Sequence, residues 1–153
     1  MTELVNAMEF LDKARRRMRF GIFSRVPLKL LRVEWKEDQV ECDWIMRPAD
    51  PWDKFLPPAL VEEHQTLQAL RDALNLRDVV FKAFPSVTRA DLCMFRVDVD
   101  LRHELMMAGT VTRSNEVLQR VSSIAMRAKL CGFRFSLAQG VLESMHQVTI
   151  GCI

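Results

Sequence analysis

The sequence predicts an α+β fold, with a mainly antiparallel sheet built from two or three hairpins and helices packed on one face. Two observations carry this prediction. Segments in which apolar and polar residues alternate come in pairs, each joined by a short polar loop, as in β-hairpins. Longer segments with apolar residues at helical spacing separate these pairs. Strand pairs interrupted by single helices are typical of a sheet that helices cover on one face.

The size and composition fit one domain over residues 1–153. The hydrophobic fraction of 49% and the charged fraction of 27% are ordinary for a globular protein. We divide the domain into an N-terminal helix, hairpin and Trp/Pro loop (1–58) and a helix–hairpin–helix–strand part (59–153). No run of about 18 apolar residues occurs, so no transmembrane segment is predicted.

The N-terminus and the cysteines predict a cytoplasmic protein. The stretch MTELVNAMEFLDKARRR places acids before arginines, the reverse of a secretory signal. Without an export signal, four thiols are favoured over two disulfides. These cysteines are Cys42, Cys93, Cys131 and Cys152.

The first part is predicted to hold one helix and one hairpin. Apolar residues near helical spacing predict a helix over 3–19, with Thr2 as its N-cap and Gly21 at its end. The runs LKLLRVEWK and VECDWIMR, separated by residues 37–39, predict a hairpin. Its apolar and aromatic face would consist of Val33, Trp35, Val40, Cys42 and Trp44.

The second part is predicted to begin with a helix over 59–84, which Pro85 ends. Its apolar stripe would consist of Leu67, Leu70, Leu74, Phe81 and Phe84. A strand pair over 90–112 follows, with a turn near residues 100–103. A helix over 115–130 is expected next, capped by Ser114 or Asn115 and ended by Gly132. The last strand or hairpin would turn at Gln139-Gly140.

The segment 104–142, ELMMAGTVTRSNEVLQRVSSIAMRAKLCGFRFSLAQGVL, resembles the second half of a BON domain. That family tends to show an apolar strand ending in Gly-x-Val, a polar turn, an alanine-bearing helix, a glycine and a last strand. The matching residues are Gly109, Val111, Ile124, Ala125 and Gly132. The helix and strand within 66–99 would complete an αββαβ pattern. The resemblance implies a small binding module with membrane or ligand association, although this chain lacks an export signal and carries a long tryptophan-rich N-terminal region.

No motif for catalysis or metal binding stands out. His64, His103 and His146 lie on three predicted elements, and none pairs with another His or Cys at a ligand spacing. GxSxG, GxGxxG and a glycine-rich phosphate loop are all missing from the sequence. We therefore predict no catalytic residue, no metal and no cofactor. A Cys- or Asp-dependent enzyme that uses the 42–53 segment stays an alternative.

A cluster of arginines near the N-terminus forms the one dense basic patch. Such a patch could hold the phosphates of nucleic acid or of anionic lipid. Arginines in the last turn of a helix also favour the helix dipole without any ligand, and the net charge is only +2. We therefore expect a structural role and no nucleic-acid partner. The patch consists of Arg15, Arg16, Arg17 and Arg19.

The segment CDWIMRPADPWDKFLPP offers the best candidate for a recognition surface. Together with Trp35 it holds all three tryptophans, and prolines stiffen it. A rigid loop with aromatic anchors loses little entropy on association, although packing as a lid over the sheet would also explain it. The candidate binding residues are Trp35, Trp44, Arg47, Asp50, Trp52, Asp53 and Phe55.

The sequence therefore predicts a binding module that contacts a protein partner or a second copy of itself. A small apolar molecule or lipid is the alternative ligand, because nine methionines offer adaptable pocket walls.

Overall fold

The structure is a computed structural model. It describes residues 10, 12–14, 16, 21, 24–36, 38–98, 100–113 and 121–145. Of the helix predicted over 3–19, residues 10, 12–14 and 16 are described, and these are helical. The predicted caps Thr2, Ser114 and Asn115 lie outside the described residues.

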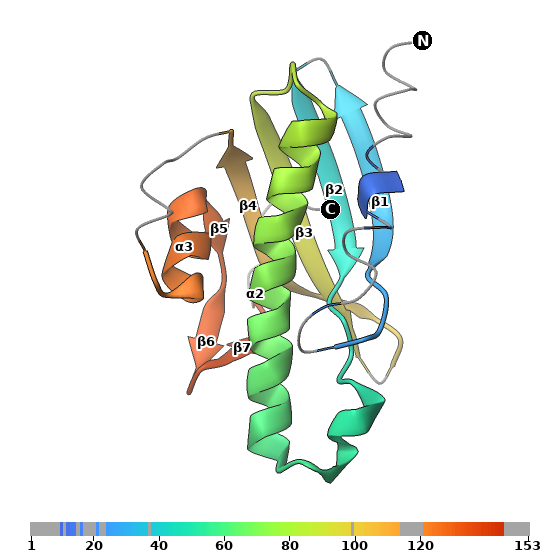
Figure 1. Cartoon of the computed structure of the whole chain (residues 1–153), viewed down its shortest axis with the longest axis vertical. Coiled ribbons are helices and arrows are strands. Elements are labelled where there is room, and N and C mark those ends of the chain that lie inside the picture. The colour runs from blue at the N-terminus through green and yellow to red at the C-terminus, as the bar shows by residue number, and fades with distance from the viewer. Residues whose placement is uncertain are drawn as a thin grey trace.

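A five-stranded sheet forms the centre of the molecule (Figure 1), in the order β1-β2-β3-β4-β5. Its strands are β1 (Lys29–Lys36), β2 (Gln39–Ile45), β3 (Arg89–Val97), β4 (His103–Thr112) and β5 (Phe133–Arg134). The β1–β2, β3–β4 and β4–β5 pairs are antiparallel, whereas β2 and β3 are parallel neighbours. The predicted α+β class with a mainly antiparallel sheet is therefore confirmed.

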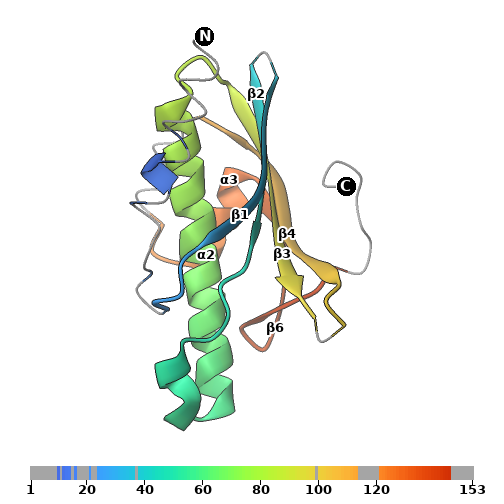
Figure 2. The ribbon, with the colours of Figure 1, turned by 90° about the vertical axis from the view of Figure 1, so that its right-hand side faces the viewer.

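Two helices cover the same face of this sheet. Helix α2 (Pro58–Ala83) is 26 residues long and connects β2 to β3, and α3 (Ile124–Cys131) lies beside it. Figure 2 shows both helices on one side of the strands. A short 3₁₀ helix, η1 (Pro51–Phe55), precedes α2. The hairpin of β6 (Ser136–Ala138) and β7 (Val141–Glu143) forms a separate two-stranded sheet.

The main core lies between the sheet and α2. The strand face predicted to be apolar does point into it, since Val40, Cys42 and Trp44 are fully buried there while Val33 and Trp35 pack at its edge. On β3, Leu92 and Met94 join this core. Their neighbours Cys93 and Phe95 belong to a smaller cluster with Leu105, Ala108 and Met145. Alternate residues of β3 therefore serve two different clusters, as strand geometry requires.

An arginine that directly follows β4 binds the C-terminal end of α2. The guanidinium of Arg113 donates to the carbonyl oxygens of Phe81 and Phe84, both at 2.8 Å, and of Pro85 at 2.9 Å. The last carbonyls of a helix lack partners within the helix, so a cation that binds them also complements the helix dipole.

Helix α3 is shorter than predicted. Residues 121–123 are not helical, and the helix begins at Ile124 after Ser123, whose Oγ accepts from the Met126 N–H at 3.3 Å. A serine inside the predicted helix therefore provides the cap from which α3 starts. The predicted end is confirmed, because Gly132 has a left-handed φ of 115°.

Two glycines meet where α3 returns to the sheet. A Cβ on Gly109 of β4 would lie 2.5 Å from the Gly132 carbonyl oxygen and 2.8 Å from the Phe133 Cα. Glycine is therefore required at residue 109 for this close approach of two backbones.

The last hairpin turns where the sequence predicts. Gln139 and Gly140 have φ values of 55° and 81°, the two positive values that a two-residue type I′ turn needs.

Candidate functional site

The aromatic turn, defined as residues 50–56, is built around Asp50. Its carboxylate accepts from the Trp52 N–H at 2.9 Å and from the Arg25 N–H at 2.7 Å. These two backbone donors stabilise the charged form and lower the pKa of Asp50 below its ordinary value. Asp50 thus caps η1 and ties it to the chain segment before β1.

The aromatic turn presents two large apolar side chains to the outside. Trp52 is 73% exposed and Phe55 is 82% exposed, and no residue of η1 is buried. The Lys54 ammonium lies 5.0 Å from the centre of the Phe55 ring. Asp53 turns the other way, toward α2, where its carboxylate is 3.6 Å from Nδ1 of His64. One side of the turn is therefore an exposed aromatic surface, and the other side contacts α2 through Asp53.

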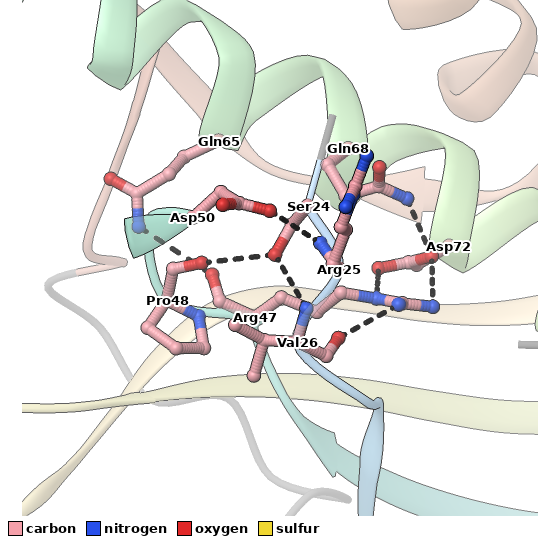
Figure 3. A network of polar contacts seen from close by, with 9 residues as sticks. All are labelled: Ser24, Arg25, Val26, Arg47, Pro48, Asp50, Gln65, Gln68 and Asp72. Atoms are coloured by element: carbon pink, nitrogen blue, oxygen red, sulfur yellow. Dashed lines mark hydrogen bonds and ion pairs between the residues drawn. The ribbon is translucent and has the colours of Figure 1, made fainter. Parts of the chain in front are cut away.

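Arg47 lies beneath this turn rather than on the recognition surface where the sequence analysis placed it. It is only 3% exposed, and its guanidinium donates to Asp72 of α2 at 2.8 and 3.1 Å and to the Val26 carbonyl at 2.9 Å. Gln68 donates to the same carboxylate at 2.9 Å. Figure 3 shows these groups converging between α2 and the end of β2. Arg47 therefore fixes the start of the loop to the helix.

Asp72 and Gln68 are the important residues that the sequence analysis missed. They stand one helical turn apart on α2, and both are buried, as are the neighbouring apolar residues Ala69, Leu70, Ala73 and Leu76. Burial raises the pKa of Asp72, while Arg47 and Gln68 oppose the rise. A polar pair at i, i+4 inside an apolar stripe is the signal that would have indicated a buried partner.

The tryptophans do not form one surface. Trp44 is fully buried against α2, and its Nε1 has no hydrogen-bond partner among the residues that the structure describes. Trp35 is half-buried, with its ring 5.0 Å from that of Phe84. Both lie on the helix-covered face of the sheet, which is why Trp44 cannot contact a partner. Of the candidate binding residues with aromatic side chains, Trp52 and Phe55 in the aromatic turn are therefore the ones that are largely exposed.

The basic patch is described only at Arg16. This exposed side chain forms an i, i+4 ion pair with Asp12 at 3.2 Å. Arg15, Arg17 and Arg19 lie outside the described residues. The prediction of a structural role for the patch therefore stays a prediction.

The described cysteines differ from the expected set of four thiols. Cys93 is disulfide-bonded, which corrects that expectation for this residue. Cys42 and Cys131 are free and buried, and burial raises the pKa of both. A thiol that is neutral and covered is a poor nucleophile. Within the described ranges, no three His, Cys, Asp or Glu side chains gather in a way that could hold a metal ion.

A second surface feature is a groove that the sequence analysis did not predict. It lies between the first turns of α2 (59–70), the start of α3 (123–125) and the hairpin 137–143, and it has a volume of about 740 Å³. We call it the α2–α3 groove. Leu67, Leu70, Ile124 and Leu142 contribute its apolar floor, while Glu62, Glu63 and Glu143 are exposed at its rim.

Among the described residues, no helix has the length and the apolar character that crossing a bilayer requires. The element order α2-β3-β4-α3-β5 follows the expected αββαβ pattern, while the BON resemblance itself stays a prediction. Comparison with known proteins finds no family model, no curated protein and no solved structure that matches this chain.

Proposed function

We propose that this protein is a non-catalytic binding module that recognises a protein partner through the aromatic turn. The exposure of Trp52 and Phe55, three residues apart on a five-residue 3₁₀ helix, carries the proposal. Buried in a complementary pocket, two such side chains remove a large apolar area from water. Tryptophan is also among the residues that most often carry the binding energy of protein interfaces.

The anchoring of the turn supports the same function. Asp50 holds two backbone N–H groups, Pro51 opens the 3₁₀ helix, and Arg47 fixes the preceding chain to Asp72. A surface that is already ordered loses little conformational entropy when it binds. An anchored aromatic turn is therefore better suited to recognition than a loop that must order itself on contact.

The partner would offer an apolar pocket next to an acidic group. Lys54 lies over the Phe55 ring and is the basic residue of the aromatic turn. A carboxylate beside the pocket would complement it at the rim of the interface, where such pairs affect specificity and association rate more than affinity. A second copy of the chain is one form that this partner could take.

The test combines site-specific crosslinking with truncation of the two aromatic side chains. A photo-crosslinking amino acid at position 55 should trap the partner in cells. The same group at position 101 serves as the control, because Leu101 is also 81% exposed but lies on the β3–β4 turn. The trapped partner is then purified, and its affinity for the wild-type chain, for W52A/F55A and for L101A is measured by titration calorimetry.

We expect W52A/F55A to weaken binding by at least about 2 kcal/mol, or roughly thirtyfold, because both anchors are lost. L101A should bind like the wild type. Thermal unfolding of W52A/F55A should shift by no more than the equivalent of about 0.5 kcal/mol, since both side chains are exposed. Equal trapping at positions 55 and 101, or unchanged affinity of W52A/F55A, would remove the proposal. Sedimentation of the wild type across a range of concentrations shows whether the partner is a second copy.

A further inference from the structure

The α2–α3 groove has the dimensions and the lining of a small-molecule site. Its volume of about 740 Å³ falls within the range of roughly 300 to 1,000 Å³ that ligand pockets occupy. The floor consists of leucine and isoleucine side chains from both helices and from the hairpin 137–143. A site of this kind favours an apolar body of limited length.

The walls of the groove are held in place by polar contacts. The Leu142 N–H donates to Oγ1 of Thr66 at 3.0 Å, which attaches the hairpin to α2 across 76 residues of sequence. Thr66 is itself buried. At the opposite wall, Ser123 caps the start of α3. The hairpin is therefore attached to α2 by a hydrogen bond, and α3 also contacts α2, as expected for a site that exists before its ligand binds.

The charge of the rim specifies the ligand further. Glu62 and Glu63 on α2 and Glu143 on β7 are exposed, and all three line the groove. No Lys, Arg or His is found among the described residues that line it. Three carboxylates without a basic neighbour in the lining create a negative potential at the mouth of an apolar groove. Such a surface repels an anionic headgroup and attracts a cationic one.

We propose that the α2–α3 groove binds a small amphiphile with an apolar body and a single cationic head. The apolar body lies on Leu67, Leu70 and Ile124, where its burial supplies the main driving force. The ammonium head stays at the rim beside Glu62 and Glu63, so that it remains partly hydrated and avoids the cost of burying a charge. The carboxylates therefore select the charge of the ligand, and the apolar floor selects its length.

This site is separate from the proposed protein interface. Figure 1 places the β6–β7 hairpin and η1 on opposite sides of α2. Trp52 and Phe55 do not line the groove. Failure of one proposal therefore leaves the other unaffected.

The experiment uses three probes with the same tail and different heads: octylammonium, octanol and octanoate, each below its aggregation limit. Binding is followed by chemical shifts of the methyl groups that line the groove. E62Q/E63Q removes two charges from the rim, and A59W fills the mouth from an exposed position. The matched control, D38N/D100N, removes two exposed carboxylates from the β1–β2 and β3–β4 turns. W52A/F55A tests independence from the aromatic turn.

Octylammonium should shift the groove methyl signals of the full chain, and octanoate should not. E62Q/E63Q should weaken octylammonium binding roughly three- to tenfold, as expected for two exposed charge pairs. Added salt should reduce the affinity of the wild type, and A59W should abolish binding. D38N/D100N and W52A/F55A should bind like the wild type. Octanoate that binds as well as octylammonium, no response to any of the three probes, or binding of only a basic amphipathic peptide would each overturn the proposal.

Discussion

Asp50 determines the conformation of the aromatic turn through two hydrogen bonds from the backbone. Its carboxylate accepts from the N–H groups of Arg25 and Trp52, so both segments depend on one side chain being charged. A carboxylate whose pKa is lower in the folded state adds stability above its unfolded pKa. That contribution is lost as the pH falls through the folded pKa. For Asp50 the loss therefore occurs below its ordinary pKa of 3.8.

We predict that protonation of Asp50 in acid weakens the two hydrogen bonds that hold the aromatic turn. Carboxyl NMR should give an Asp50 pKa below 3.8, and the amide signals of Arg25 and Trp52 should titrate with it. In D50N these linked amide shifts should vanish, because asparagine keeps the shape of the side chain but does not ionise in this range. An ordinary Asp50 pKa, or amide signals that do not respond, would contradict the assigned hydrogen bonds.

Single residues also show where sequence-based prediction ends. Alternation along β2 correctly placed Trp44 on the apolar face of the hairpin. Alternation does not reveal what covers a face, and here the cover is α2, a separate element that follows the whole Trp/Pro loop. Arg47 shows the same limit, because its partner Asp72 is 25 residues away and no local pattern connects them. The irregular course of the proline-rich segment could be predicted because turn chemistry is local, whereas the binding role of Asp50, Trp52 and Phe55 stays a prediction.

At the scale of elements, the contact between β4 and the end of α3 depends on the absence of a side chain. A Cβ on Gly109 would collide with the backbone of Gly132 and Phe133, neither of which can rotate away. We therefore predict that G109A destabilises the fold by about 1 to 3 kcal/mol, since the strand and the helix end must separate. Chemical denaturation measures this loss as a lower midpoint.

The control for this prediction is G140N. A Cβ at residue 140 would meet no atom within 4 Å, and asparagine tolerates the left-handed conformation there. G140N should therefore cost less than G109A. Equal losses in the two variants would show that steric contact at residue 109 is not the cause.

The elements differ in how well the sequence predicts them. Both main hairpins and α2 follow from local periodicity, and their predicted boundaries agree closely with the structure. The start of α3 does not, because Ser123 caps a helix start inside the predicted 115–130 helix. The parallel pairing of β2 with β3 could not be predicted from alternation. Alternation indicates the face to which each side chain points, but it does not identify the neighbouring strand.

At the scale of the whole molecule, the core covers the two free thiols that the structure describes. Cys42 is fully buried and Cys131 is 7% exposed, and burial raises the pKa of each. A reagent that needs the thiolate therefore reaches Cys42 only when the sheet and α2 separate.

We predict that the alkylation rate of Cys42 in the native protein is limited by global unfolding. Mass spectrometry of labelled peptides, followed over time, should give a Cys42 rate that rises with denaturant in parallel with the unfolded fraction. Cys131 should label by the same route or through local opening of α3. Rapid native labelling of Cys42 would contradict this core and would revive the alternative of a cysteine-dependent enzyme.

The parallel pairing of β2 with β3 also has a consequence for biosynthesis. The first hairpin leaves the ribosome while one long edge of β2 still lacks its neighbour, and that neighbour is made only after the whole of α2. Until β3 is made, the nascent polypeptide carries an open strand edge, and until α2 is made, Trp44 lacks the helix that covers it. Such surfaces can pair with other chains. The edge of β2 that later pairs with β3 is therefore where nascent copies are most exposed to aggregation or to binding by a chaperone.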